Sequence, residues 1–168
     1  CLTKRDLARY YEAVADWILA HLADRPTTLL RCPEGVGAKC FFQRHARPGT
    51  GTALRRVRIT MEAGGGDFLI ADSLPALIEL VQMGVLEIHT WNAVARQLER
   101  PDRAVFDLDP GPEGRWPQML DAARLVRRTL RDVKLESFVK TTGGKGLHVV
   151  VPLAPSSWEK VTEFTRAV

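Results

Sequence analysis

The sequence is poor in cysteine and has no long apolar run. Its cysteines are Cys1, Cys32 and Cys40, too few and too unevenly spaced for a disulfide framework, so reduced thiols are expected. A zinc site of Cys32, Cys40 and His45 is an alternative, although the paired C-x-x-C spacing of structural zinc sites is missing. No run approaches the roughly 18 apolar residues of a membrane span, and we expect no signal peptide. These features predict a cytoplasmic protein that does not bind membranes.

Composition predicts a globular protein. The chain has 168 residues, of which 45% are hydrophobic and 26% charged, so disorder as the main state is excluded and one domain with a core is expected. The net charge of +4 favours an anionic partner only weakly, because many basic proteins bind no polyanion. A helix begins within a few residues of Cys1, and Val168 falls inside a predicted helix. We therefore expect residues 1–168 to form a single partial domain that is cut at both ends.

Hydrophobic periodicity and turn residues predict helices interspersed with short strands. The first predicted helix follows the capping-box spacing at Thr3. The second runs from Ser73 to about Met83, the third runs from about Trp116 to Asp132, and the fourth begins near Ser156. The predicted strands are Thr27–Arg31, Cys40–Gln43, Val57–Met61, Asp67–Ala71, Leu86–Thr90, Ala104–Leu108, Leu135–Lys140 and Leu147–Val151. Turns rich in proline and glycine favour antiparallel pairing of the first strands. The pattern predicts an α+β (mixed α/β) fold.

Two carboxylates are expected on one face of a strand. Side chains alternate along a strand, so Asp107 and Asp109 in VFDLDP point the same way. Such close acids repel each other unless a positive group lies between them, and carboxylate oxygens suit Mg²⁺ or Mn²⁺. The alternative is two solvated acids at a strand end. The D-x-D pattern alone does not decide between these interpretations.

A glycine-rich loop, KTTGGKGLHV, joins the last two predicted strands. Its backbone N–H groups can approach an anion, Lys145 adds positive charge, and the Thr142 hydroxyl can donate a hydrogen bond. It is not a Walker A loop, because the G-x-x-x-x-G-K-[ST] spacing fails and a strand follows. Alone, the loop is equally a mobile turn, and His148 a half-buried structural histidine. Together with Asp107 and Asp109, it predicts a two-metal site facing a triphosphate, as nucleotidyl transfer requires.

Six segments, which lie in order along essentially the whole chain, carry a family resemblance. They read TKRDLARYYEAVADWIL, RPTTLLRCPEG, CFFQRH, LVQMGVLEIHTWN, VFDLDP and KTTGGKGLHVVVPL. The series resembles the polymerase domain of bacterial ATP-dependent ligase D, a branch of the archaeo-eukaryotic primase superfamily. The resemblance implies a primase-polymerase-like fold of antiparallel or mixed sheets flanked by helices. It also implies that the fold is incomplete here, lacking the family's third carboxylate and the strand before the first helix.

The resemblance implies roles for individual side chains. Asp107 and Asp109 look like the first two catalytic, metal-binding carboxylates. The implied nucleotide-binding residues are His89, Thr142, Lys145 and His148. The implied DNA-binding residues are Lys4 and Arg31 at a downstream 5′-phosphate, and Phe41 and Phe42 at the template base, where aromatic rings stack on unpaired bases. The physical alternative for Phe41 and Phe42 is that one ring lies in the core while the other is exposed on the same strand.

Some positions depart from the family pattern. Leu30 stands where some members carry a lysine of the 5′-phosphate pocket, and Thr142 stands where some carry serine. Four acids on predicted helices match no position of the third carboxylate: Asp121, Asp132, Glu159 and Glu163. The parent protein is therefore expected to be an enzyme, whereas the activity of this chain alone stays open.

The resemblance implies a metal-dependent nucleotidyltransferase, a DNA-directed polymerase or primase that fills gaps and extends ends in non-homologous end joining. It implies two Mn²⁺ or Mg²⁺ ions, an NTP or dNTP substrate and DNA ends with a 5′-phosphate. Further implied partners are fused ligase or nuclease domains and a bacterial end-binding Ku protein, in the nucleoid-associated cytoplasm. One alternative is a non-catalytic DNA-end binding module that uses Lys4 and Arg31. The other is a haloacid-dehalogenase-type phosphatase, although Gly111 stands where that class carries threonine or valine.

Overall fold

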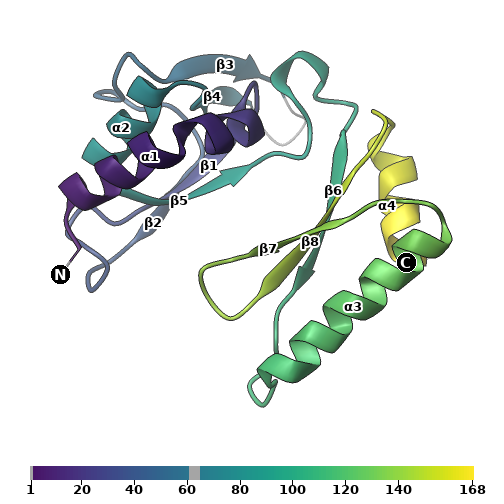
Figure 1. Ribbon diagram of the computed structural model, residues 1–168. Helices are drawn as coiled ribbons and strands as arrows, with labels where there is room; N and C mark the ends of the chain where they lie inside the picture. Colours follow the sequence, from purple (N-terminus) through teal and green to yellow (C-terminus); the bar gives the residue numbers. More distant parts are fainter. Residues whose placement is uncertain (1, 61–64) are drawn as a thin grey trace. The chain divides into compact units, whose positions relative to one another are not determined.

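The computed structural model describes residues 2–60 and 65–168, so the predicted strand end at Met61 lies outside the described residues. The chain divides into two compact units, one ending at Arg96 and the other beginning at Gln97, and each is considered by itself (Figure 1). Both units combine an antiparallel sheet with helices, which confirms the predicted α+β class. The single partial domain expected for the whole chain stays a prediction.

The first unit is a five-stranded antiparallel sheet with two helices. Its elements are α1 (Lys4–Leu22), β1 (Thr27–Arg31), β2 (Phe41–Gln43), β3 (Arg55–Ile59), β4 (Gly66–Ile70), α2 (Leu74–Gln82) and β5 (Val85–Thr90), and the short helix η1 (Ala95–Gln97) follows. The strand order is β2-β1-β4-β3, and β5 also pairs with β1. Thr3 and Asp6 form the predicted capping box at the start of α1. Ser73 caps α2 through a hydrogen bond from Ala76 N.

The core of this unit lies on one face of the sheet, and α2 connects its parts. One side of α2 packs on the sheet in a cluster that contains Leu29, Leu69, Ala76, Leu80 and Val85. The other side of α2 packs on α1 in a cluster that contains Tyr11, Leu22, Leu77 and Val81. Residues paired across an antiparallel ladder share a face, so the residues that alternate with Leu29 and its partners point to the opposite face. This face is open at β2 and β5, where Phe42 and His89 are exposed, and covered at β4, where Phe68 is buried. Two residues of the predicted site lie there.

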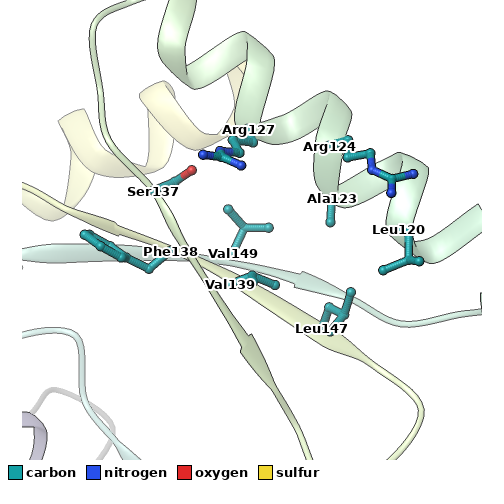
Figure 2. A pocket seen from close by; sticks show the side chains of 9 residues that line it. All are labelled: Leu120, Ala123, Arg124, Arg127, Ser137, Phe138, Val139, Leu147 and Val149. Carbon is teal, nitrogen blue, oxygen red and sulfur yellow. The ribbon is translucent and has the colours of Figure 1, made fainter.

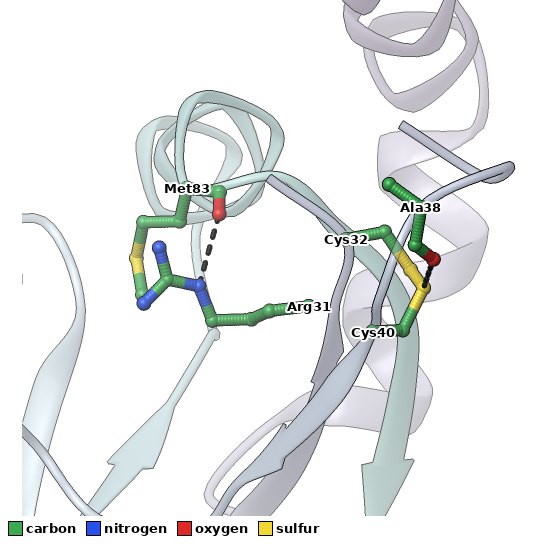
Figure 3. The surroundings of a disulfide bond; sticks show 5 residues. All are labelled: Arg31, Cys32, Ala38, Cys40 and Met83. Carbon is green, nitrogen blue, oxygen red and sulfur yellow. Dashed lines mark hydrogen bonds between the residues drawn. A yellow bond between two sulfur atoms is a disulfide. The ribbon is translucent and has the colours of Figure 1, made fainter. Parts of the chain in front are cut away.

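A disulfide bond joins Cys32 to Cys40 between β1 and β2 (Figure 3). Arg31 pairs with Phe41 across these strands, so the cysteines that directly follow and precede them meet, with Cα atoms 4.4 Å apart. The prediction of reduced thiols is therefore wrong for this pair, and the alternative zinc site is wrong because both of its thiols are bonded to each other. The signal was present in the sequence as two cysteines that close a hairpin, because antiparallel pairing brings such residues together.

The second unit is a three-stranded antiparallel sheet with two helices on one face. Its elements are β6 (Arg103–Leu108), α3 (Trp116–Asp132), β7 (Phe138–Thr141), β8 (Leu147–Pro152) and α4 (Trp158–Ala167), and the strand order is β6-β8-β7. The core between sheet and helices is built from Ala104, Leu130, Val149, Val151 and Val161. The opposite face of the sheet is open and carries the alternate residues of each strand.

Several boundaries in this unit differ from the prediction, and two of the differences have a clear local cause. Strand β7 begins at Phe138 rather than Leu135, because Leu135 N still donates to Leu130 O at 2.9 Å and completes the end of α3. Helix α4 is capped by Ser157 rather than Ser156, since the Ser157 hydroxyl accepts from the backbone of the third helical residue. Within the part of the chain that the structure describes, no helix has the length and apolarity needed to cross a membrane.

Candidate functional site

The two predicted carboxylates lie at the end of β6, on the open face of the second unit's sheet. The β6–β8 register places Asp107 opposite His148, and His148 Nε2 lies 3.2 Å from Asp107 Oδ1. The Asp107 side chain is 60% exposed, whereas that of His148 is 25% exposed. The acid of the first motif and the imidazole of the second motif are therefore in direct contact at the surface.

The glycine loop approaches the second carboxylate at Gly146. A Cβ at this position would lie 2.5 Å from Asp109 Oδ1 and 2.9 Å from Leu108 O, so a side chain here would displace the carboxylate. Thr142 closes the loop, because its hydroxyl donates to Gly146 O at 3.1 Å and accepts from Gly144 N at 3.3 Å. The Thr142 hydroxyl thus shapes the loop from within.

Two lysines lie near the carboxylates in different surroundings. Lys145 is exposed in the glycine loop. Lys140 lies opposite His148 in the β7–β8 register, in one row with Asp107. Partial burial and the charge of Arg103 lower the pKa of Lys140, and the charge of Asp107 opposes this effect. The predicted site omitted Lys140, since only the strand register shows that it shares a row with the acid and the imidazole.

The donor set at β6 fits a divalent cation that retains part of its hydration shell. Among residues 2–60 and 65–168, no group of three or more histidine, cysteine, aspartate or glutamate side chains forms a closed metal site. Mg²⁺ is commonly held by one or two carboxylates together with waters and substrate phosphates, and Mn²⁺ also accepts oxygen ligands. Asp107 and Asp109 supply this kind of set, which a bound triphosphate would complete.

In the first unit, Phe42 and His89 form an aromatic pair on the open face of the sheet. They flank the central strand β1, where Phe42 pairs with Leu30 and His89 pairs with Thr28. The ring centroids are 5.6 Å apart with an interplanar angle of 70°, an edge-to-face contact. Phe42 is 58% exposed, and His89 Nε2 lies 2.8 Å from a carboxylate oxygen of Glu87. Phe42, which is predicted at the template base, and His89, which is predicted at the nucleotide, thus lie on one surface.

Phe41 points to the other face of β2, since neighbouring residues of a strand alternate. Its ring lies beneath two guanidinium groups, with Arg31 Cζ at 5.4 Å and Arg47 Cζ at 6.0 Å from the centroid. Phe41 is half-buried and Phe42 exposed, so the two rings have different surroundings. Of the two rings, that of Phe42 is the more accessible from solvent.

Lys4 and Arg31, the residues predicted at a 5′-phosphate, converge on the C-terminal end of α2. Lys4 Nζ donates to Gln82 O at 2.8 Å. Arg31 Nε donates to Met83 O at 2.9 Å, the contact that Figure 3 shows. These are consecutive carbonyls at a helix end that carries partial negative charge, which favours cations. Arg31 also donates to Gln43 Oε1 at 2.8 Å. The structure brings together two cations that lie far apart in the sequence.

Comparison with known proteins agrees with this arrangement. Residues 3–168 match the family model described as the primase-polymerase domain of LigD. The chain belongs to the LigD primase-polymerase family. It is 41% identical over 167 residues to the multifunctional non-homologous end joining protein LigD of Pseudomonas aeruginosa. It is 36% identical over 175 residues to the multifunctional non-homologous end joining DNA repair protein LigD of Mycobacterium tuberculosis.

A solved structure supports the same assignment of fold. The polymerase domain of Mycobacterium tuberculosis ligase D, in complex with DNA, superposes with a TM-score of 0.88 and 33% sequence identity. The match covers 96% of this chain and 60% of that chain. The match to the Pseudomonas protein covers 99% of this chain and 20% of the relative's length. The predicted membership of the LigD primase-polymerase family and its fold are confirmed, and the roles of individual residues stay predictions.

Proposed function

We propose that Asp107 and Asp109 belong to a metal-dependent nucleotidyltransferase site that acts at DNA ends in non-homologous end joining. The main support is that two separate motifs lie in contact with each other. His148 of the glycine-loop motif contacts Asp107 at 3.2 Å, and Gly146 of the same motif leaves room for the Asp109 carboxylate. Membership of the LigD primase-polymerase family, whose curated relatives are named as end-joining proteins, supports the reaction class.

Each side chain has a defined task in this proposal. Asp107 and Asp109 hold Mn²⁺ or Mg²⁺, which when bound neutralises triphosphate charge and activates a primer 3′-hydroxyl. Lys145 and the loop amides bind phosphate oxygens of an NTP or dNTP. His148 presents a hydrogen-bond donor next to the carboxylates, and Thr142 keeps the loop in its binding shape through Gly146. Positioning and electrostatics therefore supply most of the rate.

The four acids on the helices of the second unit are poorly placed to act as a third carboxylate. Asp121 and Asp132 lie on α3, and Glu159 and Glu163 lie on α4. Both helices cover the face of the sheet opposite to Asp107, and Asp121 is engaged with Arg124 at 2.9 Å. We propose that the described residues bind metal and nucleotide, and that turnover requires a further carboxylate from elsewhere in the parent protein.

The location of the metal can be tested directly by NMR. Substoichiometric Mn²⁺ broadens the signals of nuclei near the ion, so the backbone signals of Gly146 and His148 should disappear first. The Asp107→Asn/Asp109→Asn variant should retain these signals, whereas Asp121→Asn, a control on the other side of the sheet, should behave as wild type. Uniform broadening across the chain, or identical broadening in the double variant, would refute the proposed metal site.

A second function, DNA-end binding, is supported by the convergence of Lys4 and Arg31 on α2. An ammonium has three donors and a guanidinium five, and the structure shows one contact for Lys4 and two for Arg31 with protein acceptors. The remaining donors can bind a 5′-phosphate. Leu30, where the resemblance implies a lysine in some members, supplies no cation and points to the opposite face of β1 from Arg31. We propose that this end-binding site acts in addition to the nucleotidyltransferase site, and that its DNA binding survives loss of Asp107 and Asp109.

A further inference from the structure

Strand β7 forms a free edge of the second unit's sheet. It pairs with β8 on one side, and within the described residues no backbone hydrogen bond joins its other side to a partner. All of its residues, Phe138–Thr141, are exposed. An exposed strand edge presents unpaired N–H and C=O groups in the pattern that an added strand requires. This edge is therefore able to accept an extended chain.

An apolar groove runs between this edge strand and α3 (Figure 2). Its volume is about 460 Å³. The strands supply its floor through Val139, Leu147 and Val149, and Arg124 and Arg127 of α3 lie along the helix side of the groove. Because side chains alternate along a strand, an added strand beside β7 would turn every second side chain toward this groove.

The helix side of the groove carries uncompensated positive charge. Arg124 has one exposed partner, Asp121, at 2.9 Å. For Arg127, Arg128 and Arg131, the described part of the chain shows no ion pair. Arginines at helical spacings of three and four residues repel each other, so an anionic partner is favoured at this face. Guanidinium groups suit carboxylates in particular, because they bind them with two parallel hydrogen bonds.

We propose that this groove binds an extended acidic peptide segment of another protein by strand addition to β7. Of the peptide side chains that point toward the groove, apolar ones fill it over the valine floor and acidic ones beside α3 meet Arg127 and Arg124. The floor residues Val139 and Val149 point away from the His148 face of the sheet. The peptide therefore binds on the opposite side of the sheet from the proposed metal site, and its binding is independent of the proposed nucleotidyl transfer.

A nucleic-acid strand fits this groove less well than a peptide. Single-stranded nucleic acid is usually held by several aromatic rings and a basic channel. The ring available at this groove is Phe138, which projects away from the floor valines (Figure 2). The apolar floor and the free strand edge instead match the two requirements of an added peptide strand, alternate apolar side chains and main-chain hydrogen bonds.

Fluorescence anisotropy with a designed probe tests the charge requirement. The probe is a fluorescein-labelled octapeptide with the repeated sequence Val-Thr-Asp-Thr, which carries valine and aspartate on the same face of a strand, added to the full 168-residue chain. Arg127→Glu should weaken binding at least about tenfold, as expected for loss of a charge-assisted hydrogen bond. Arg128→Glu is the matched control, because it makes the same change of charge one residue away and does not line the groove. It should weaken binding less than about twofold.

Two further measurements test the strand addition itself. A peptide N-methylated at alternate residues should lose binding, and the unmodified peptide should slow amide exchange within Phe138–Thr141. Absence of binding at millimolar peptide, equal weakening by Arg127→Glu and Arg128→Glu, or unchanged binding of the methylated peptide would each overturn the proposal. So would a thymidine oligonucleotide that binds more tightly than the peptide and is equally sensitive to Arg127→Glu, because the groove would then be a nucleic-acid surface.

Discussion

The Asp109 carboxylate rests against the backbone of Gly146, where an added Cβ would lie 2.5 Å from Asp109 Oδ1. The same Cβ would lie 2.9 Å from Leu108 O, so the strand end as well as the carboxylate would have to move. This contact joins the acid motif to the glycine loop. Glycine at this position is therefore needed for the observed placement of the Asp109 carboxylate, the proposed metal ligand.

Gly146→Ala should weaken Mn²⁺ binding about tenfold or more, the loss typical of disturbing the groups that orient a metal ligand. Gly144→Ala is the matched control in the same loop, since its Cβ would meet only Thr142 Oγ1, at 3.8 Å. Titration of Mn²⁺ followed by electron paramagnetic resonance measures both affinities. Equal affinities of the two variants would show that the contact with Asp109 has no role in metal binding.

Lys4→Ala should remove the preference for DNA ends with a 5′-phosphate over ends with a 5′-hydroxyl. We expect about tenfold weaker binding of the phosphorylated end, because one charge-assisted hydrogen bond is lost. Arg5→Ala removes an exposed cation from the adjacent position and should weaken both DNAs equally. The measurement is a pair of binding curves on duplexes that differ only in the phosphate. If Lys4→Ala also weakens both DNAs equally, the cation acts through general charge and the pocket assignment is wrong.

Phe42→Ala should weaken binding of DNA with a single-stranded template overhang. Stacking of a base on an aromatic ring contributes about 1–3 kcal/mol. Phe138→Ala is a suitable control because its ring is equally exposed, at 59% against 58% for Phe42, and lies in the other unit. Thermal unfolding of both variants should match wild type within about 0.5 kcal/mol. Equal losses of overhang binding would argue against a specific stacking role.

Asp24 contributes stability to the first unit in a pH-dependent way. It accepts from Arg55 at 2.7 Å and from Arg96 at 3.0 Å. Burial alone would raise the pKa of Asp24, but the hydrogen bonds and charges of Arg55 and Arg96 together outweigh it and lower the pKa. A lowered folded-state pKa means that this stability is present above about pH 3.9 and is lost as the pH falls through the folded-state pKa.

Asp24→Asn should therefore reduce the free energy of unfolding by about 1 kcal/mol at pH 7. The difference from wild type should shrink as the pH falls below about 3.9. Asparagine tolerates the positive φ of 55° at this position, so the substitution tests charge without new backbone strain. Asp121→Asn, at a pair whose carboxylate is 73% exposed, should change stability by less than about 0.5 kcal/mol. A pH-independent loss in Asp24→Asn would contradict the ionic origin.

The sequence predicted those elements that local signals define. The capping box at Thr3 begins α1, and the apolar run Thr27–Arg31 is β1 with the same bounds. The amphipathic pattern gave α3 as Trp116–Asp132, again as observed. Period and capping residues act within a few positions, which is why these bounds were predictable. The residue types at β6 and in the glycine loop identified the candidate site for the same reason.

Other features depend on contacts between distant residues. Strand register places Lys140 beside His148, and periodicity within either strand does not determine this register. Lys4 of α1 and Arg31 of β1 bind consecutive carbonyls at the end of α2, which no local sequence signal predicts. The Cys32–Cys40 bond was missed because cysteine count and expected compartment were given more weight than hairpin pairing.

Calorimetric titration of ATP in the presence of Mn²⁺ tests the central claim, that the two motifs form one metal–nucleotide site. Wild type should bind ATP in a Mn²⁺-dependent way, and Asp107→Ala/Asp109→Ala should lose this binding while Asp121→Asn retains it. Lys145→Ala should weaken binding without abolishing it, because the loop amides remain. Metal-independent ATP binding, or binding that survives in the double variant, would contradict the account.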